Sequence, residues 1–357
     1  MRRITIILLT MLTMTAYGQT NKEKAYDLGM KAIKEMDAGK IRDAIKLLEQ
    51  SKELDPDNID YPYEIAYAHY LDKSYTDAIK ILKGLTKHDK VNDRIYQMLG
   101  NCYDMEKNPD KAIETYETGL KFYPNSGILY LERGNMEFVK EDYNKALGYY
   151  EQGIEVQPKF SSNYYWAAKI FMSSTEEVWG LLYGEIFMNL ERNSNRTAEI
   201  SELLYNTYKS QITFTSDTSM TVSFCQQMTM NINEISEDRE MKLPFCMIYE
   251  PTLLLSVAFA KSIDIKSLDD IRTSFVENYY KMGHNKTHPN ALFDYQKQIM
   301  DNGHLEAYNH WILMKGDEDA FSTWNDSNKD KWDSFVAWFS ENPIEISDTN
   351  RFYSGQY

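Results

Sequence analysis

The sequence has few of the residues and patterns that mark the common kinds of active site. Its 357 residues include three Cys and six His, with neither a Cys-x-x-Cys pair nor the Cys and His spacing of a zinc site. The Gly-x-Ser-x-Gly turn, the Ser-x-x-Lys motif and the glycine-rich phosphate loop are missing as well. We therefore assign no catalytic residue, and we expect neither a cofactor nor a bound metal.

Basic residues are also in short supply. Lys and Arg number 39 against 54 Asp and Glu, which gives a formal net charge of -15, and no basic run interrupts this excess. Because affinity for nucleic acid depends on Lys and Arg that neutralise phosphates, we expect no nucleic-acid partner. Hydrophobic residues make up 43% of the chain and charged residues 26%, which is the composition of a folded protein.

A short apolar run lies at the start of the sequence, within MRRITIILLTMLTMTAYGQT. Two arginines precede an apolar stretch at 4–14, and the small residues Ala16 and Gly18 precede a cleavage point ahead of Gln19. This is the anatomy of a secretory signal peptide, and the run is too short for a membrane span. We expect residues 1–18 to be removed, leaving an exported protein that is periplasmic or secreted and soluble. The alternative is a buried first helix.

What the chain does contain is a repeat. An alanine returns every 34 residues, within the similar stretches RDAIKLLEQ, TDAIKILKG, DKAIETYET and NKALGYYEQ, at Ala44, Ala78, Ala112 and Ala146. A second set of small residues keeps the same step, at Ala32, Ala66, Gly100, Gly134 and Ala168. A period of this length indicates helical hairpins that stack on one another, because a single hairpin cannot bury its own apolar face.

The repeat resembles the tetratricopeptide repeat family over about residues 25–192. Four clear copies are expected at 25–58, 59–92, 93–126 and 127–160, with a degenerate copy at 161–194 in which Gly180 takes the alanine position. Departures from the family pattern are Pro62, Lys90, Lys31 and Arg133. The resemblance implies an all-α fold, a right-handed α-α superhelix of helical hairpins, over 19–194.

By the same resemblance, the first helices of the hairpins line a concave groove that binds an extended peptide or a protein. The residues on that side of the helices are Tyr63, Tyr67, Tyr70, Arg94, Gln97, Asn101, Leu131, Asn135, Tyr165 and Lys169. Asn at the position of Asn101 and Asn135 can bond a peptide in the family. The lysines of the family's carboxylate clamp are replaced here by Tyr63, Gln97 and Leu131. For the tyrosines, packing between repeats is the alternative.

Residues typical of helix starts support the same repeat boundaries. Ser74, Asn108 and Asp142 are good N-cap residues, and Ser74 with Asp77 forms a box-like pair. Pro109 follows Asn108 at the first helical position, where a missing N–H costs nothing.

The region 195–357 has no repeat and is expected to be mostly helical. Thr197 is the expected N-cap of its first helix. Alternation of apolar residues with Thr and Ser in 211–225 predicts a small β-hairpin or an extended excursion over the helices. Helices should follow, one broken near Pro251 and the next capped by Ser267 with Asp270. The tail after Pro343 should be loosely ordered.

The remaining Cys and His leave alternatives open. Cys225 and Cys246 form a disulfide across a short loop, or all three cysteines are small buried thiols; in the first case Cys102 is left over. GHNKTH places His284 and His288 four residues apart, as on one face of a metal-binding helix. Gly283 and the adjoining turn residues favour surface or capping histidines instead.

These observations together predict a non-catalytic scaffold of the cell envelope that binds a protein or extended peptide in the concave groove. It would not span a membrane, and its oligomeric state is open. The alternative is an enzyme or glycan-binding protein with its site in 195–357 and the repeats as support.

Overall fold

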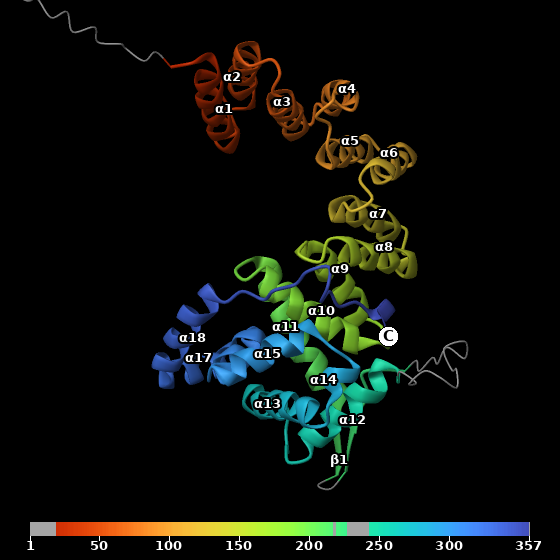
Figure 1. Cartoon of the computed structure of the whole chain (residues 1–357), viewed down its shortest axis with the longest axis vertical. Helices are drawn as coiled ribbons and strands as arrows, with labels where there is room; N and C mark the ends of the chain where they lie inside the picture. The colour runs from red at the N-terminus through yellow and green to blue at the C-terminus, as the bar shows by residue number, and fades with distance from the viewer. Residues whose placement is uncertain (1–18, 217–218, 227–242, 357) are drawn as a thin grey trace, which may run out of the picture. The chain divides into compact units, whose positions relative to one another are not determined.

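The computed structural model describes residues 19–216, 219–226 and 243–356 (Figure 1). Within these ranges the fold is all-α, with helices α1–α18 and a single two-stranded sheet. The expected leader, 1–18, lies outside the described residues. The chain divides into two compact units, one that ends at Ala112 and one that begins at Ile113, and each is described by itself.

Unit 1 consists of helical hairpins that coincide with the predicted repeats. Its helices are α1 (Asn21–Asp37), α2 (Ile41–Leu54), α3 (Asp60–Leu71), α4 (Tyr75–Leu85), α5 (Asp93–Met105) and the start of α6 (Pro109–Phe122). The periodic residues Ala32, Ala44, Ala66 and Ala78 have no exposed surface. Each sits where two helices approach closely, which explains why a small residue returns at these positions.

In the first four repeats, the turn between the two helices of the hairpin uses the left-handed backbone region. Gly39, Lys73, Lys107 and Glu141 lie one period apart and have φ angles of 74°, 61°, 60° and 62°. The first copy alone supplies a glycine, for which this conformation is free of strain. The lysines and the glutamate adopt it at a cost, because a Cβ crowds the following carbonyl oxygen.

Helix caps follow the sequence prediction in part. The side chains of Asn108 and Asp142 accept hydrogen bonds from the backbone N–H of Lys111 and Lys145, each at 3.3 Å. The predicted pair of Ser74 and Asp77 is wrong, because the Ser74 hydroxyl donates to Asp72 at 3.4 Å and makes no cap. Ser74 occupies the N-cap position, but its side chain is turned back to the end of α3.

Unit 2 begins with further hairpins of the same kind. After the rest of α6, its next helices are α7 (Gly127–Val139), α8 (Tyr143–Val156), α9 (Ser161–Met172) and α10 (Glu177–Leu190). Two glycines permit close helix contacts: a Cβ on Gly134 would lie 2.3 Å from a ring carbon of Tyr150, and one on Gly180 2.6 Å from the backbone N of Met172. The degenerate fifth copy is therefore a complete hairpin.

The 34-residue spacing of the helix starts continues for one helix beyond the last recurring residues of the repeat. α11 (Asn195–Gln211) begins 34 residues after α9. Its N-cap is Ser194, which forms a capping box with Thr197, so the prediction of Thr197 as the cap is wrong. α11 thus takes the place of the first helix of a sixth repeat.

The rest of unit 2 departs from the repeat. Strands β1 (Ile212–Ser216) and β2 (Ser219–Val222) form the predicted antiparallel hairpin. The later elements are α12 (Phe245–Val257), α13 (Ile265–Lys281), α14 (His284–Thr287), α15 (Ala291–Asp301), α16 (Leu305–Leu313), α17 (Glu318–Ser327), α18 (Lys329–Glu341) and the 3₁₀ turn Ser354–Gln356.

Two predictions in this part of the chain are wrong. α12 does not break at Pro251 but runs through it. α13 begins earlier than expected, since Asp264 and Ser267 form its capping box and Asp270 lies inside the helix.

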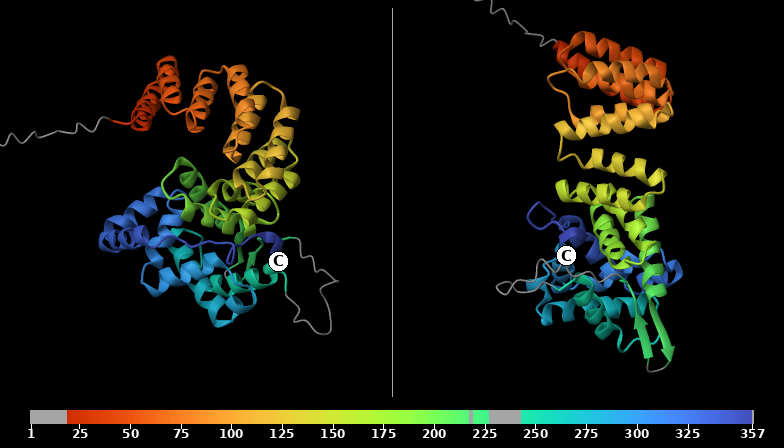
Figure 2. Two further views of the ribbon diagram at one scale, coloured as in Figure 1. Left: turned by 45° about the horizontal axis from the view of Figure 1, so that its top comes forward. Right: turned by 90° about the vertical axis from the view of Figure 1, so that its right-hand side faces the viewer.

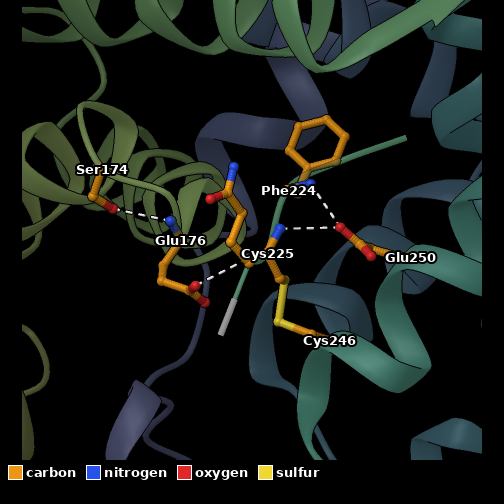
Figure 3. Close-up of a disulfide and its surroundings, with 7 residues drawn as sticks. Ser174, Glu176, Phe224, Cys225, Cys246 and Glu250 are labelled. Carbon is orange, nitrogen blue, oxygen red and sulfur yellow. Dashed lines mark hydrogen bonds between the residues drawn. A yellow bond between two sulfur atoms is a disulfide. The ribbon is translucent and has the colours of Figure 1, made fainter. Parts of the chain in front are cut away.

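A disulfide fastens the hairpin to α12 (Figure 3). It joins Cys225, just after β2, to Cys246 in the first turn of α12. The carboxylate of Glu250 accepts the backbone N–H groups of Phe224 and Cys225 at 2.6 and 3.0 Å. Cys102 is the free cysteine left over; burial raises the pKa of its thiol to about 12.

The segment after α18 is packed, contrary to the expectation of a loose tail. Ile346 and Phe352 are each 1% exposed. The Phe352 ring lies 5.8 Å from that of Trp179, and the Ser354 N–H donates to the Tyr183 hydroxyl at 2.7 Å. The chain end therefore returns to α10 (Figure 2). Apolar residues of the tail supply the reason, since they fill the same core as the fifth hairpin.

A buried ion pair crosses this core. The Arg272 guanidinium on α13 donates to both carboxylate oxygens of Glu185 on α10, at 2.7 and 2.9 Å. Gln296 and Tyr308 also donate to Glu185, at 2.6 and 2.8 Å. Because each partner is enclosed, neither charge can be removed without leaving the other unpaired in the interior.

Candidate functional site

Six of the predicted groove residues line one cavity in unit 1. The cavity has a volume of about 390 Å³ and lies between α3 and α5, the first helices of two successive repeats. Its walls are Tyr63, Glu64, Tyr67, Tyr70, Arg94, Gln97, Met98 and Asn101. This volume falls in the range that accommodates a small ligand or a few side chains of a peptide. Glu64 and Met98 were not among the predicted groove residues; they lie next to Tyr63 and Gln97 in the chain.

Helical periodicity brings these side chains together. On α3 the three tyrosines follow one another at steps of four and three residues, so they share one face. The neighbouring face carries Ile65 and Ala66, which are buried in the core of unit 1. On α5, Gln97 and Asn101 lie one period after Tyr63 and Tyr67, and Arg94 lies three residues before Gln97 on the same side. The packing face and the cavity face overlap, because Tyr63 and Met98 line the cavity and are also buried members of the core of unit 1.

Two residues that line the cavity, Arg94 and Tyr63, contact each other. The guanidinium carbon lies 4.9 Å from the centre of the Tyr63 ring, a cation–π arrangement. Burial raises the pKa of the Tyr63 hydroxyl, with Arg94 opposing the shift. Tyr63 is 9% exposed, whereas Tyr67 is 37% exposed and available for contact. The Tyr70 ring is braced edge-on by Tyr75, at 5.5 Å between ring centres.

The lining combines several kinds of binding group. Burial raises the pKa of Glu64, again with Arg94 opposing. Gln97 and Asn101 add carboxamides, each with a donor and an acceptor, as a peptide backbone requires. Within this described lining there is no His, Cys or Ser to serve as a nucleophile or its base. The arrangement can hold a chain segment by ring faces, hydrogen bonds and one cation.

The predicted groove residues of unit 2 are engaged in contacts within the chain. Leu131 packs against the core of unit 2. The Asn135 carboxamide accepts from the Tyr150 hydroxyl at 2.9 Å and donates to Glu132 at 3.1 Å. Lys169 donates to Glu199 on α11 at 2.6 Å, and the Tyr165 hydroxyl donates to the same carboxylate.

Arg133, one of the departures from the family pattern, has a structural explanation. The side chain is buried, pairs with Glu137 at 2.9 Å and Glu117 at 3.3 Å, and lies over the Tyr149 ring at 4.5 Å. The arginine therefore replaces an expected leucine by packing its stem and satisfying its charge locally.

The histidines of unit 2 hold loops and rings in place. His288 is 2% exposed and bonds the Leu243 carbonyl at 2.7 Å through Nε2. His310 bonds the Glu306 carbonyl at 2.8 Å, and its ring stacks on Trp324 at 4.0 Å. In the described ranges, the one Cys, His, Asp and Glu group close enough to hold a metal consists of Glu176 with Cys225 and Cys246, whose sulfurs are joined to each other.

A second cavity, of about 310 Å³, lies in unit 2 between α15 and the segment after α18. Three carboxylates line it, from Asp294, Glu341 and Glu345, together with amide and apolar side chains. None of these residues was singled out by the sequence.

Comparison with known proteins agrees with the hairpin architecture. The family model described as tetratricopeptide repeat matches residues 35–99 and 69–132. The chain thus contains tetratricopeptide repeats, the class of protein that the hairpins and their period define. None of the curated proteins compared with it matches.

Several solved structures are similar in fold. A thermophilic tetratricopeptide repeat protein of Thermus thermophilus is 14% identical, with 50% of this chain and 98% of that chain covered and a TM-score of 0.42. PilW, a type IV pilus biogenesis factor, is 16% identical over 52% and 85%, with a TM-score of 0.41. MamA is 19% identical over 47% and 92%, with a TM-score of 0.36.

Proposed function

We propose that the protein is a non-catalytic scaffold of the cell envelope whose repeats bind an extended segment of another protein at the cavity between α3 and α5. The observation that carries the proposal is the convergence of six residues, chosen from the family resemblance and the repeat register, on one cavity of about 390 Å³. A hollow of this volume is suited to a ligand, and Tyr63, which also belongs to the core of unit 1, forms part of its buried wall.

The chemistry of the lining favours a peptide over a small metabolite. The exposed Tyr67 ring offers an apolar face that any side chain can contact. Gln97 and Asn101 lie one helical turn apart, a spacing that lets two carboxamides address successive groups of an extended backbone. Arg94 provides a positive charge for an acidic side chain.

Export to the envelope is supported by two independent features. The sequence begins with an arginine pair, a short apolar run and small residues ahead of Gln19, as signal peptides do. The disulfide between Cys225 and Cys246 is of a kind that persists in an oxidising compartment.

Peptide display against the full chain tests the binding proposal. Selected peptides should compete with one another for binding. The double substitution Tyr67→Ala with Asn101→Ala should lower their affinity at least tenfold, because a ring contact and a hydrogen bond are lost. Tyr143→Ala removes a tyrosine that is 46% exposed on α8 and serves as the matched control. Peptides that bind equally to all three proteins would show that the site lies elsewhere.

A further inference from the structure

α12 is apolar on two faces, of which the core uses one. Its buried side chains include Phe245, Tyr249 and Leu253. The opposite face is in solvent and consists of Met247, Pro251, Leu254, Leu255, Ala258 and Phe259, which we call the α12 outer face. Four of these side chains are large and exposed, to 41% for Met247, 44% for Leu254, 55% for Leu255 and 95% for Phe259.

The spacing makes the α12 outer face continuous. Steps of three and four residues from Met247 to Phe259 keep every member on one side of the helix and its last turn. Scattered apolar residues are normal on a protein surface, but a contiguous stripe indicates an interaction site. A helix that is apolar all round is otherwise found in a protein interior or in contact with lipid.

The polar groups of α12 are all directed away from this face. Glu250, its one charged residue, accepts two backbone N–H groups beside the disulfide. The Thr252 and Ser256 hydroxyls donate to the carbonyls one turn earlier, at 2.7 and 2.8 Å, and both residues are buried. The outer face therefore contains no hydrogen-bonding side chain that a protein partner of ordinary polarity would use.

Two lysines follow the end of the face in the chain, in a stretch that also contains Asp264 and Asp270. Lys261 and Lys266 follow Phe259 closely and are both exposed. Across the described part of the chain, neither takes part in an ion pair. An apolar stripe with exposed lysines at its rim matches the boundary of a membrane, where acyl chains lie beneath phosphate groups.

We propose that the α12 outer face binds the surface of an anionic lipid membrane, with Leu255 and Phe259 inserted below the headgroups and Lys261 and Lys266 against the phosphates. No helix in the described ranges has the length and apolar character to cross a bilayer. A single patch of this size gives weak, reversible binding. The inference stands on unit 2 and does not depend on the cavity of unit 1.

Flotation with lipid vesicles tests the proposal, using the chain from Gln19 onward, which holds all the described structure. The wild type should float with vesicles that contain phosphatidylglycerol. Leu255→Ser with Phe259→Ser should lower the partition coefficient at least tenfold, because two large apolar groups are lost from the interface. Lys261→Gln with Lys266→Gln should lower it about tenfold on anionic vesicles and leave weak binding to phosphatidylcholine unchanged.

Val139→Ser is the matched control, since Val139 is 81% exposed on α7. It should float like the wild type. Failure of the wild type to float, or flotation that survives the α12 substitutions, overturns the proposal. A wild-type dimer that the same substitutions convert to a monomer would assign the face to a second copy instead.

A thiol probe decides whether residues 227–242 cover the face. Leu255→Cys should react rapidly without vesicles and slowly with them, while buried Cys102 does not contribute. Slow reaction without vesicles would mean that the chain itself covers the face, and the proposal would be wrong.

Discussion

The hydroxyl of Tyr165 donates a hydrogen bond to the carboxylate of Glu199, and the two residues lie 34 positions apart. Arg196 and Ser162 are bonded at the same separation, at 3.1 Å. Contacts one period apart therefore join α9 to α11 as they would join the first helices of two repeats. The C-terminal region begins as a continuation of the stack, and after α11 its β-hairpin and later helices depart from the repeat.

This continuity predicts that residues 195–357 do not fold alone. Ile200 and Leu204 pack against Gly184 of α10, and Arg272 would lose Glu185, its buried partner. Loss of one partner of a buried pair costs about 3–5 kcal/mol. A fragment that begins ahead of α6 should unfold cooperatively in urea, followed by circular dichroism, whereas 195–357 should show no cooperative transition. A cooperative 195–357 fragment would support the domain boundary predicted at 194/195.

The Lys169–Glu199 pair should make stability depend on pH in the acid range. Burial raises the pKa of Glu199, but bonds from Lys169 and Tyr165 and the lysine's charge outweigh it and leave the pKa below its ordinary value. A lowered pKa gives stability that is present above the unfolded-state value of about 4.3 and is lost as pH falls. Lys169→Met should cost about 0.5–1 kcal/mol at pH 7, because the pair is partly exposed, and less at pH 3.

Urea titrations at several pH values measure this difference. Lys159→Met removes an exposed lysine that has no ion pair in the described structure, and it should show no such pH dependence. A cost for Lys169→Met that is equal at pH 7 and pH 3 would assign the loss to packing.

The left-handed turns predict stabilising substitutions to glycine. Lys73→Gly and Lys107→Gly should each raise the free energy of unfolding by about 0.5–1 kcal/mol, because relief of the Cβ strain exceeds the entropy cost of glycine. Lys80→Gly, on the exposed side of α4, should lower it by about 1 kcal/mol. Thermal unfolding compares the stabilities of the three variants. Destabilisation by all three substitutions would contradict backbone strain at Lys73 and Lys107.

Two glycines of unit 2 predict opposite responses to alanine. Gly134→Ala should cost about 1–3 kcal/mol, since its Cβ would lie 2.3 Å from the fully buried Tyr150 ring. Gly148→Ala, on α8, meets nothing within 4 Å and should gain about 0.5–1 kcal/mol from helix propensity. Both substitutions lie in unit 2, so the same urea unfolding transition measures their effects on stability. Equal effects of the two substitutions would contradict the close contact between Gly134 and Tyr150.

Much of the repeat region could be predicted from the sequence. The 34-residue step of Ala44, Ala78 and their equivalents indicated the helix pairs, and the family resemblance pointed to the residues that line the cavity. Glu64 was overlooked because it lies beside the tyrosine stripe and not in it. α11 was predicted as a helix, but with its cap at Thr197, because Asn195 keeps the spacing of the helix starts but none of the repeat's residues.

Beyond Gln211 the local pattern carried less information. The hairpin was readable from its alternation, but the packed tail and the Glu185–Arg272 pair depend on residues far apart in the chain. Caps were misplaced at α11 and α13 because Ser, Thr and Asp occur within three residues of one another there, and side-chain direction decides between them.

Photo-crosslinking in cells tests the central claim most directly. A photoreactive amino acid at position 67 would face the α3–α5 cavity, and the same amino acid at position 80 would lie on the exposed side of α4. We predict that position 67 gives a discrete protein adduct that Arg94→Ala weakens, and that position 80 gives none. Adducts of equal yield at both positions, or an adduct at 67 that Arg94→Ala leaves unchanged, would contradict binding at this cavity.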